Sequence, residues 1–319
     1  MCKGDTKSVE PVKSRSLFLF SVESFSGGEI PSNASQFSTG AVIILFLIGI
    51  EMSLRLFFTS IKDAHPILDD ATNRNILSRH IGVDAFSCFV VAILGWNARH
   101  VVNDMVDATL RRRKNAMPVA FEGRMFTYQP EAQRIALFFV AYQLKNTYDT
   151  IAWNDGIIFI IHHILTLFTT WGALQGNAHF YVLFYFGVSE ISTGAVSILN
   201  ESALTCLLLL EVLCLLANFD DEHGVVGLAD AFPMVKVFLG GIFAAFFVIC
   251  RVFMWSTVSY YYCRDAWNAL SGSDPRMIRH KMWFRFTFLS LSILSLLQII
   301  WLAEIARVGK EELEKVGLL

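Results

Sequence analysis

Two adjacent histidines lie in the middle of a long apolar stretch. His162 and His163 belong to the sequence DGIIFIIHHILTLFTTWGAL. On a helix His162 shares one face with the polar residues Asp155, Thr166 and Thr169. Neighbouring residues of a helix point about 100° apart, so we expect one imidazole to face a cavity and the other to be held by a second helix. Imidazole can act as a general base or accept an acyl group near neutral pH.

Other polar side chains recur at helical spacing in further apolar stretches. Lys145 and Asp149 are four residues apart, beside a polar face that contains Gln143. A charge in hydrocarbon costs free energy unless it is paired or has a function. Lys145 and Asp149 could neutralise each other within one helix, so a structural interpretation stands beside a functional one. Glu190 needs a proton or a cation from another helix, and we expect Arg251 to be that cation.

Weaker polar patterns lie at the ends of the apolar stretches. His80 and Asp84, four residues apart, could form an oriented imidazole, and His80 is therefore kept as a candidate although a structural role is preferred. Glu51 and Arg55 are expected to cap a helix or to extend toward an interface. A metal site needs several converging imidazoles, thiolates or carboxylates. The chain has one HH pair, no HxxxH and no CxxC, so neither a metal nor a cofactor is predicted.

The composition identifies a lipid bilayer as the solvent of this chain. Of the 319 residues, 54% are hydrophobic and 17% charged, whereas soluble domains have about 25% charged residues. Apolar runs of roughly 17–25 residues match a hydrocarbon layer of about 30 Å. The net charge of −2 provides no basic field for nucleic acid, so that class of partner is excluded.

The sequence predicts an all-α, polytopic transmembrane bundle of seven helices, or of eight if residues 203–219 also cross. That segment carries Glu211 and could instead lie along the interface. Loops on the side of the N-terminal tail contain more Lys and Arg than the opposite loops, which predicts a cytoplasmic N-terminus. The seven predicted spans lie near residues 40–58, 81–97, 132–148, 156–174, 179–199, 234–260 and 283–304.

From His80 to Ile305 the chain resembles the TLC-domain family, which includes ceramide synthases and cargo receptors of the endoplasmic reticulum. The resemblance rests on the order and spacing of SRH, YQLKNTYDTIAWNDGIIFIIHHILTL, SEISTGAVSILN, FFVICRVF and LLQIIWLAEI. We therefore divide the chain into a polar tail (1–39), a first helix and loop (40–79), a TLC domain (80–305) and a C-terminal tail (306–319).

The resemblance implies a bundle of the endoplasmic reticulum membrane, with paired histidines at a central cavity and a long-chain acyl or sphingolipid ligand. In ceramide synthases the paired histidine serves N-acylation of a sphingoid base by acyl-CoA. This chain lacks the HD series of that branch and reads SEIST instead, as in the non-synthase members. The resemblance assigns site roles to His162, His163, Asp149, Glu190 and Arg251.

Three functions follow as alternatives. The first is a protein that binds a membrane lipid or acyl chain and acts in membrane lipid homeostasis, including that of sphingolipids. The second is an acyltransferase that uses long-chain acyl-CoA, with His162 or His163 as base or acyl acceptor. The third is a cargo receptor or scaffold. The supporting polar network common to these interpretations comprises Asp149, Asp155, Thr166, Glu190, Arg251 and His80.

Overall fold

The computed structural model describes residues 29–98, 121–189, 225–272, 275–315 and 317. Within these ranges the regular structure is helical and contains no strand, which confirms the predicted all-α bundle. The N-terminal part contains α1 (Asn33–Ser60), α2 (Ala71–Arg79), the π-helical segment η4 (His80–Ala85) and α3 (Phe86–Asn97). Next along the chain come α5 (Phe121–Phe126), α6 (Pro130–Trp153), α7 (Ile157–Ala173) and α8 (His179–Tyr185). The C-terminal part contains α10 (Leu228–Ala231), α11 (Pro233–Phe247), the π-helical segment η7 (Val248–Met254), α12 (Trp255–Ser271) and α13 (Pro275–Lys315).

Four of the described helical runs are long and apolar enough to cross a membrane. They are Asn33–Ser60, Ala71–Asn97, Lys236–Ser271 and His280–Lys315, and the shorter α7 is also apolar. α6 packs against α1, α3 and α7. All seven predicted spans overlap a described helix, six of them over most of their length. The fifth, 179–199, begins with α8 and then leaves the described residues, as does the eighth candidate at 203–219.

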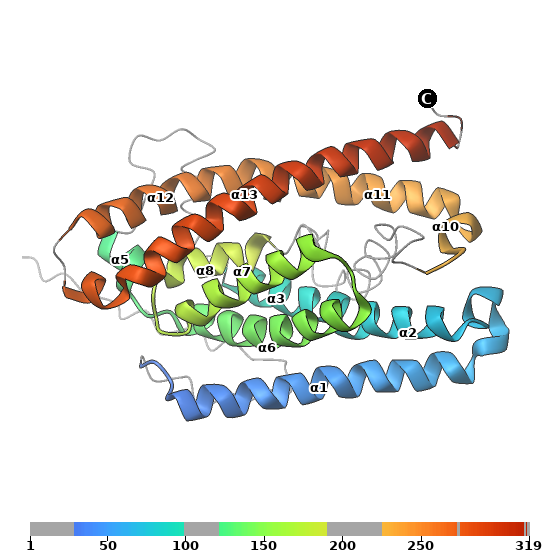
Figure 1. The fold of residues 1–319 in the computed structure, drawn as a ribbon, viewed down its shortest axis with the longest axis horizontal. Coiled ribbons are helices and arrows are strands. Elements are labelled where there is room, and N and C mark those ends of the chain that lie inside the picture. Colours follow the sequence, from blue (N-terminus) through green and yellow to red (C-terminus); the bar gives the residue numbers. More distant parts are fainter. Residues whose placement is uncertain (1–28, 99–120, 190–224, 273–274, 316, 318–319) are drawn as a thin grey trace, which may run out of the picture.

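The helices run roughly along the long axis of the molecule (Figure 1). α1 begins at the end where α5 and the turn between α12 and α13 lie, and it ends near α2 (Figure 1). The tight connection between α6 and α7 lies part of the way toward that second end, where Asp155 binds Arg79 at the end of α2 (Figure 1). The orientation in the membrane stays a prediction.

Two unusual backbone angles build the turn that joins α6 to α7. Asn154, the residue after α6, is left-handed with φ 56°, and Gly156 before α7 has φ 107°. Asparagine and glycine tolerate these conformations better than other residues. The turn folds α7 back along α6, so that His163 in the middle of α7 faces the polar residues of α6.

A close approach of two glycines packs α3 against the end of α8. A Cβ atom added at Gly95 would lie 2.5 Å from the carbonyl carbon of Gly187, and backbone cannot yield as a side chain can. We expect Gly95→Ala to lower the free energy of unfolding by about 1–3 kcal/mol through overpacking. Thermal unfolding in detergent measures the change. Gly240→Ala is the control, because a Cβ there meets nothing within 4 Å, and equal melting temperatures for the two variants would contradict the prediction.

Candidate functional site

The two central histidines have different partners. Nδ1 of His163 lies 2.8 Å from Oε1 of Gln143 in α6, and the Thr166 hydroxyl lies 3.3 Å from the same oxygen. An amide oxygen only accepts hydrogen bonds, so this contact places the proton of His163 on Nδ1. His163 and Thr166 are both buried. Gln143 thus fixes the ring of His163 from a second helix, as the sequence predicted for one of the pair.

The ring of His162 faces the opposite neighbour, α13. It packs edge-on against Trp301 with 5.2 Å between ring centroids. Its Nδ1 is buried and has no hydrogen-bond partner among the described residues. Arg251 of η7 is near enough to interact with His162 electrostatically. His162 therefore presents an available imidazole nitrogen where α7, η7 and α13 meet.

The polar face of α7 differs from the predicted one. The sequence placed Asp155, His162, Thr166 and Thr169 together, whereas the buried stripe comprises His163, Thr166 and Thr170. The reason is that α7 begins at Ile157, after Gly156, so Asp155 is not part of the helix. Thr169 instead approaches α13, where its hydroxyl lies 3.1 Å from that of Ser290.

His80 and Asp84 form the predicted pair inside η4. Nδ1 of His80 lies 2.7 Å from Oδ2 of Asp84, and Tyr142 of α6 donates to Oδ1 of Asp84 over 3.3 Å. Arg79, which the sequence interpretation did not select, binds Asp155 with 3.0 Å between Nη2 and Oδ2. His80, Asp84 and Arg79 are buried. The partner of Asp155 is thus a cation of another helix.

Lys145 binds two carboxylates at once. Its Nζ lies 2.5 Å from Oδ2 of Asp149 and 2.7 Å from Oε2 of Glu51 in α1. The pairing of Lys145 with Asp149 confirms the spacing argument. The expectation that Glu51 extends to an interface is wrong, because Glu51 points inward to Lys145. The salt bridge crosses from α1 to α6, and helical periodicity within one segment does not reveal such a contact.

These contacts join into one group, called here the buried charge cluster. Asp84 and His163 interact electrostatically, and so do Asp84 and Asp149, which links the His80 contacts to those of Lys145. With neutral histidines the cluster holds more carboxylates than cations, and no Lys or Arg occurs between Lys145 and Lys236. Such a cluster can exchange protons among its side chains, or it can bind a polar group of a ligand by hydrogen bonds. Its members are Glu51, Arg79, His80, Asp84, Lys145, Asp149, Asp155 and His163.

Of the remaining predicted site residues, Glu190 lies outside the described residues. Its predicted contact with Arg251 therefore stays a prediction. Arg251 lies in η7, with its guanidinium carbon 5.9 Å from the ring centroid of Trp255. Within the described ranges no group of three or more His, Cys, Asp or Glu side chains could hold a metal ion.

A second buried ion pair holds the short helix α5. Nε and Nη2 of Arg124 lie 2.6 and 2.8 Å from the two carboxylate oxygens of Asp265 in α12. The Tyr181 hydroxyl of α8 donates to the same carboxylate over 2.5 Å. This bidentate geometry is typical of a strong arginine–carboxylate contact. The sequence interpretation missed it, because Arg124 lies in a predicted loop without a periodic pattern.

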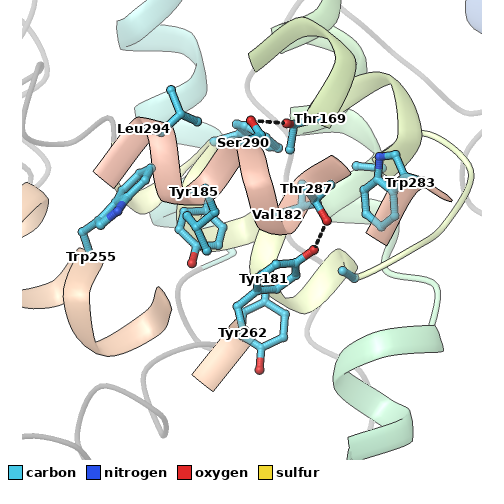
Figure 2. A pocket seen from close by; sticks show the side chains of 14 residues that line it. Thr169, Tyr181, Val182, Tyr185, Trp255, Tyr262, Trp283, Thr287, Ser290 and Leu294 are labelled. Atoms are coloured by element: carbon cyan, nitrogen blue, oxygen red, sulfur yellow. Dashed lines mark hydrogen bonds between the residues drawn. The ribbon is translucent and has the colours of Figure 1, made fainter. Parts of the chain in front are cut away.

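An aromatic pocket lies next to this ion pair, between α7, α8, α12 and α13. It has a cavity volume of about 50 Å³, which is enough for a few water molecules. Figure 2 shows Tyr181, Tyr185, Trp255, Tyr262 and Trp283 around it. The hydroxyl groups that line it bond to protein groups, as Tyr262 does to Thr287 and Tyr181 to Asp265, whereas the buried Nε1 of Trp283 has no partner among the described residues. The satisfied hydroxyl groups and the small volume favour a packing role for this pocket.

The comparison with protein families agrees with the helical membrane fold. Residues 80–307 match the family model of the TLC domain. The match covers more than half of the chain and includes both histidines and most of the buried charge cluster. The molecule is thus a multi-pass integral membrane protein, and it belongs to the TLC-domain family, a membrane family related to lipids. No curated protein and no solved structure matches the chain significantly.

Proposed function

We propose that this protein binds a membrane lipid or acyl chain within its helical bundle and acts in membrane lipid homeostasis, including that of sphingolipids. The observation that carries the proposal is the unpartnered Nδ1 of His162, buried beside Trp301. A buried nitrogen of this kind normally has a hydrogen-bond partner. A polar group of a bound lipid would supply that partner.

The neighbours of His162 suit the two parts of a lipid. Arg251 provides a positive charge for a phosphate or carbonyl oxygen, and Trp301 provides an apolar surface beside the imidazole. The adjacent His163, held by Gln143, connects this position to the buried charge cluster. A lipid head group bound at His162 would therefore interact electrostatically with the ionisable groups of the buried charge cluster, through His163.

We expect His162→Ala to reduce the retained lipid by roughly tenfold, the effect of losing one hydrogen bond of about 1.4 kcal/mol. Native mass spectrometry of wild type and variant, purified in the same mild detergent, measures the retained lipid. The fold should persist, because no hydrogen-bond partner among the described residues would be left unpaired when Nδ1 of His162 is removed. Ile164→Ala, an exposed position on the same helix, is the matched control. Unchanged lipid occupancy in His162→Ala would refute the proposal.

The same nitrogen favours acyl transfer as the second candidate function. An unpaired imidazole could act as base or accept an acyl group from long-chain acyl-CoA. Incubation with long-chain acyl-CoA, with and without a sphingoid base, followed by intact mass spectrometry would reveal an acyl adduct or product. Its loss in His162→Ala would support the transferase, and its absence from wild type would favour lipid binding alone.

A location in the endoplasmic reticulum and a sphingolipid ligand follow from the family resemblance. For the third alternative, a cargo receptor or scaffold, the described contacts provide no specific support.

A further inference from the structure

A groove separate from His162 lies where α1 rests on α6 and on the end of α7. Its volume of about 180 Å³ exceeds that of the aromatic pocket. α1 contributes residues from Asn33 to Ile44, α6 contributes apolar residues such as Leu137 and Leu144, and α7 contributes Trp171. Gly40 of α1 leaves space in the groove, because an added Cβ at this residue would meet nothing within 4 Å.

The position of the groove exposes it to the bilayer. Only 11% of the apolar window of α1 is buried, and Phe37 and Trp171, which line the groove, are 62% and 45% exposed. The residues from Asn33 to Ile44 cover about 16 Å along the helix, which is about half of a hydrocarbon core of about 30 Å. The groove thus has the length of one leaflet, as a single acyl chain requires.

The groove has a polar end and an apolar end. Asn33 and Gln36 at the start of α1 lie at the same end as Gln175, which follows α7, whereas Ile44 and Leu144 lie farther along. Among the residues that the structure describes, no charged side chain lines it. For Asn33 and Gln175 no side-chain hydrogen bond is recorded within the described ranges. Carboxamides both donate and accept hydrogen bonds, so this end suits an uncharged group that contains hydroxyls or a carbonyl.

We propose that this groove is a second lipid site, which takes one acyl chain of a neutral amphiphile with a hydroxyl-rich or ester head. The chain would lie along Gly40 and Ile44, and the head group would contact the amides of Asn33 and Gln175. Gln36 closes this end, because its Nε2 donates to the carbonyls of Pro31 and Leu174. This inference goes beyond the function proposed above, because it involves none of the residues around His162.

The test uses a monoacylglycerol that carries a diazirine and an alkyne in its chain, with the full-length protein in phosphatidylcholine nanodiscs. After illumination, peptide mapping should find the probe on peptides containing Phe37 or Trp171. Gly40→Leu fills the groove and should reduce this labelling by roughly tenfold. Gly49→Leu is the matched control, because it also lies on α1 with nothing within 4 Å of an added Cβ but does not line the groove.

Three outcomes would overturn the proposal. They are equal labelling of Gly40→Leu and wild type, an equal decrease in the Gly49→Leu control, and equal labelling by a lysophosphatidic acid probe, whose head is anionic. Asn33→Leu/Gln175→Leu removes the amides expected to contact the head group and should weaken labelling by the monoacylglycerol, while the apolar part of the groove around Gly40 stays open. His162→Ala should leave labelling of the groove unchanged, so that failure of this site and failure of the site at His162 can be distinguished.

Discussion

Lys145→Met should lower the free energy of unfolding by about 3–5 kcal/mol, the usual effect of removing one partner from a buried ion pair. Methionine retains the packing of the lysine stem but leaves Glu51 and Asp149 without their shared cation. Both carboxylates bind Lys145 within 2.7 Å, so their charges would then face each other in a low-dielectric interior. Thermal unfolding monitored by circular dichroism in detergent measures the change.

Two further variants separate this effect from a general loss of lysine. Lys310→Met removes an exposed lysine whose side chain is 71% accessible, and it should change stability by less than about 0.5 kcal/mol. Combining Lys145→Met with Glu51→Gln and Asp149→Asn removes the unpaired charges and should restore much of the loss. If the triple variant is less stable than Lys145→Met alone, burial of unpaired charge is not the cause.

Arg124→Met should have a comparable effect, a loss of about 3–5 kcal/mol. It leaves Asp265, which is 1% exposed, with Tyr181 as donor but without its bidentate cation. Because Arg124 comes from α5 and Asp265 from α12, the loss should also release α5 from the bundle. Differential scanning fluorimetry of the purified protein measures the first effect, and hydrogen exchange of residues 121–126 measures the second.

A double-mutant cycle decides whether the two residues act together. Asp265→Asn alone should also destabilise, whereas Arg124→Met/Asp265→Asn should lose less than the sum of the single variants, with a coupling of about 1–3 kcal/mol. Strictly additive losses would show that each side chain contributes through other contacts. Exchange of α5 unaltered in Arg124→Met would contradict its role as an anchor for that helix.

The sequence predicted the helices and the contacts within them, because both depend on local periodicity. Apolar runs of membrane length identified the described spans, and spacing of four residues correctly paired His80 with Asp84 and Lys145 with Asp149. The different directions of His162 and His163 followed from helical geometry in the same way. These features require no knowledge of which helices are neighbours.

Contacts between helices could not be predicted by that reasoning. Glu51 was expected at an interface, and its partner Lys145 is 94 residues away. Asp155 was placed on the face of a helix that begins two residues later, and it binds Arg79 instead. A single sequence gives the direction of a side chain around its own helix. The neighbouring helix it meets depends on the packing of the whole bundle.

The two π-helical segments, η4 and η7, interrupt long helices at His80–Ala85 and at Val248–Met254. A π-turn contains about one residue more than an α-turn, so each segment is in effect a one-residue insertion accommodated within a span. Deleting one residue there would restore a regular α-helix and leave the helix beyond it in nearly the same register, because the wide turn already accommodates the extra residue. Only residues within the wide turn, such as Asp84 in η4 or Arg251 in η7, would change direction, while the span kept nearly its full length. A one-residue deletion at these two places would therefore change the interior of the bundle locally while membrane insertion is preserved.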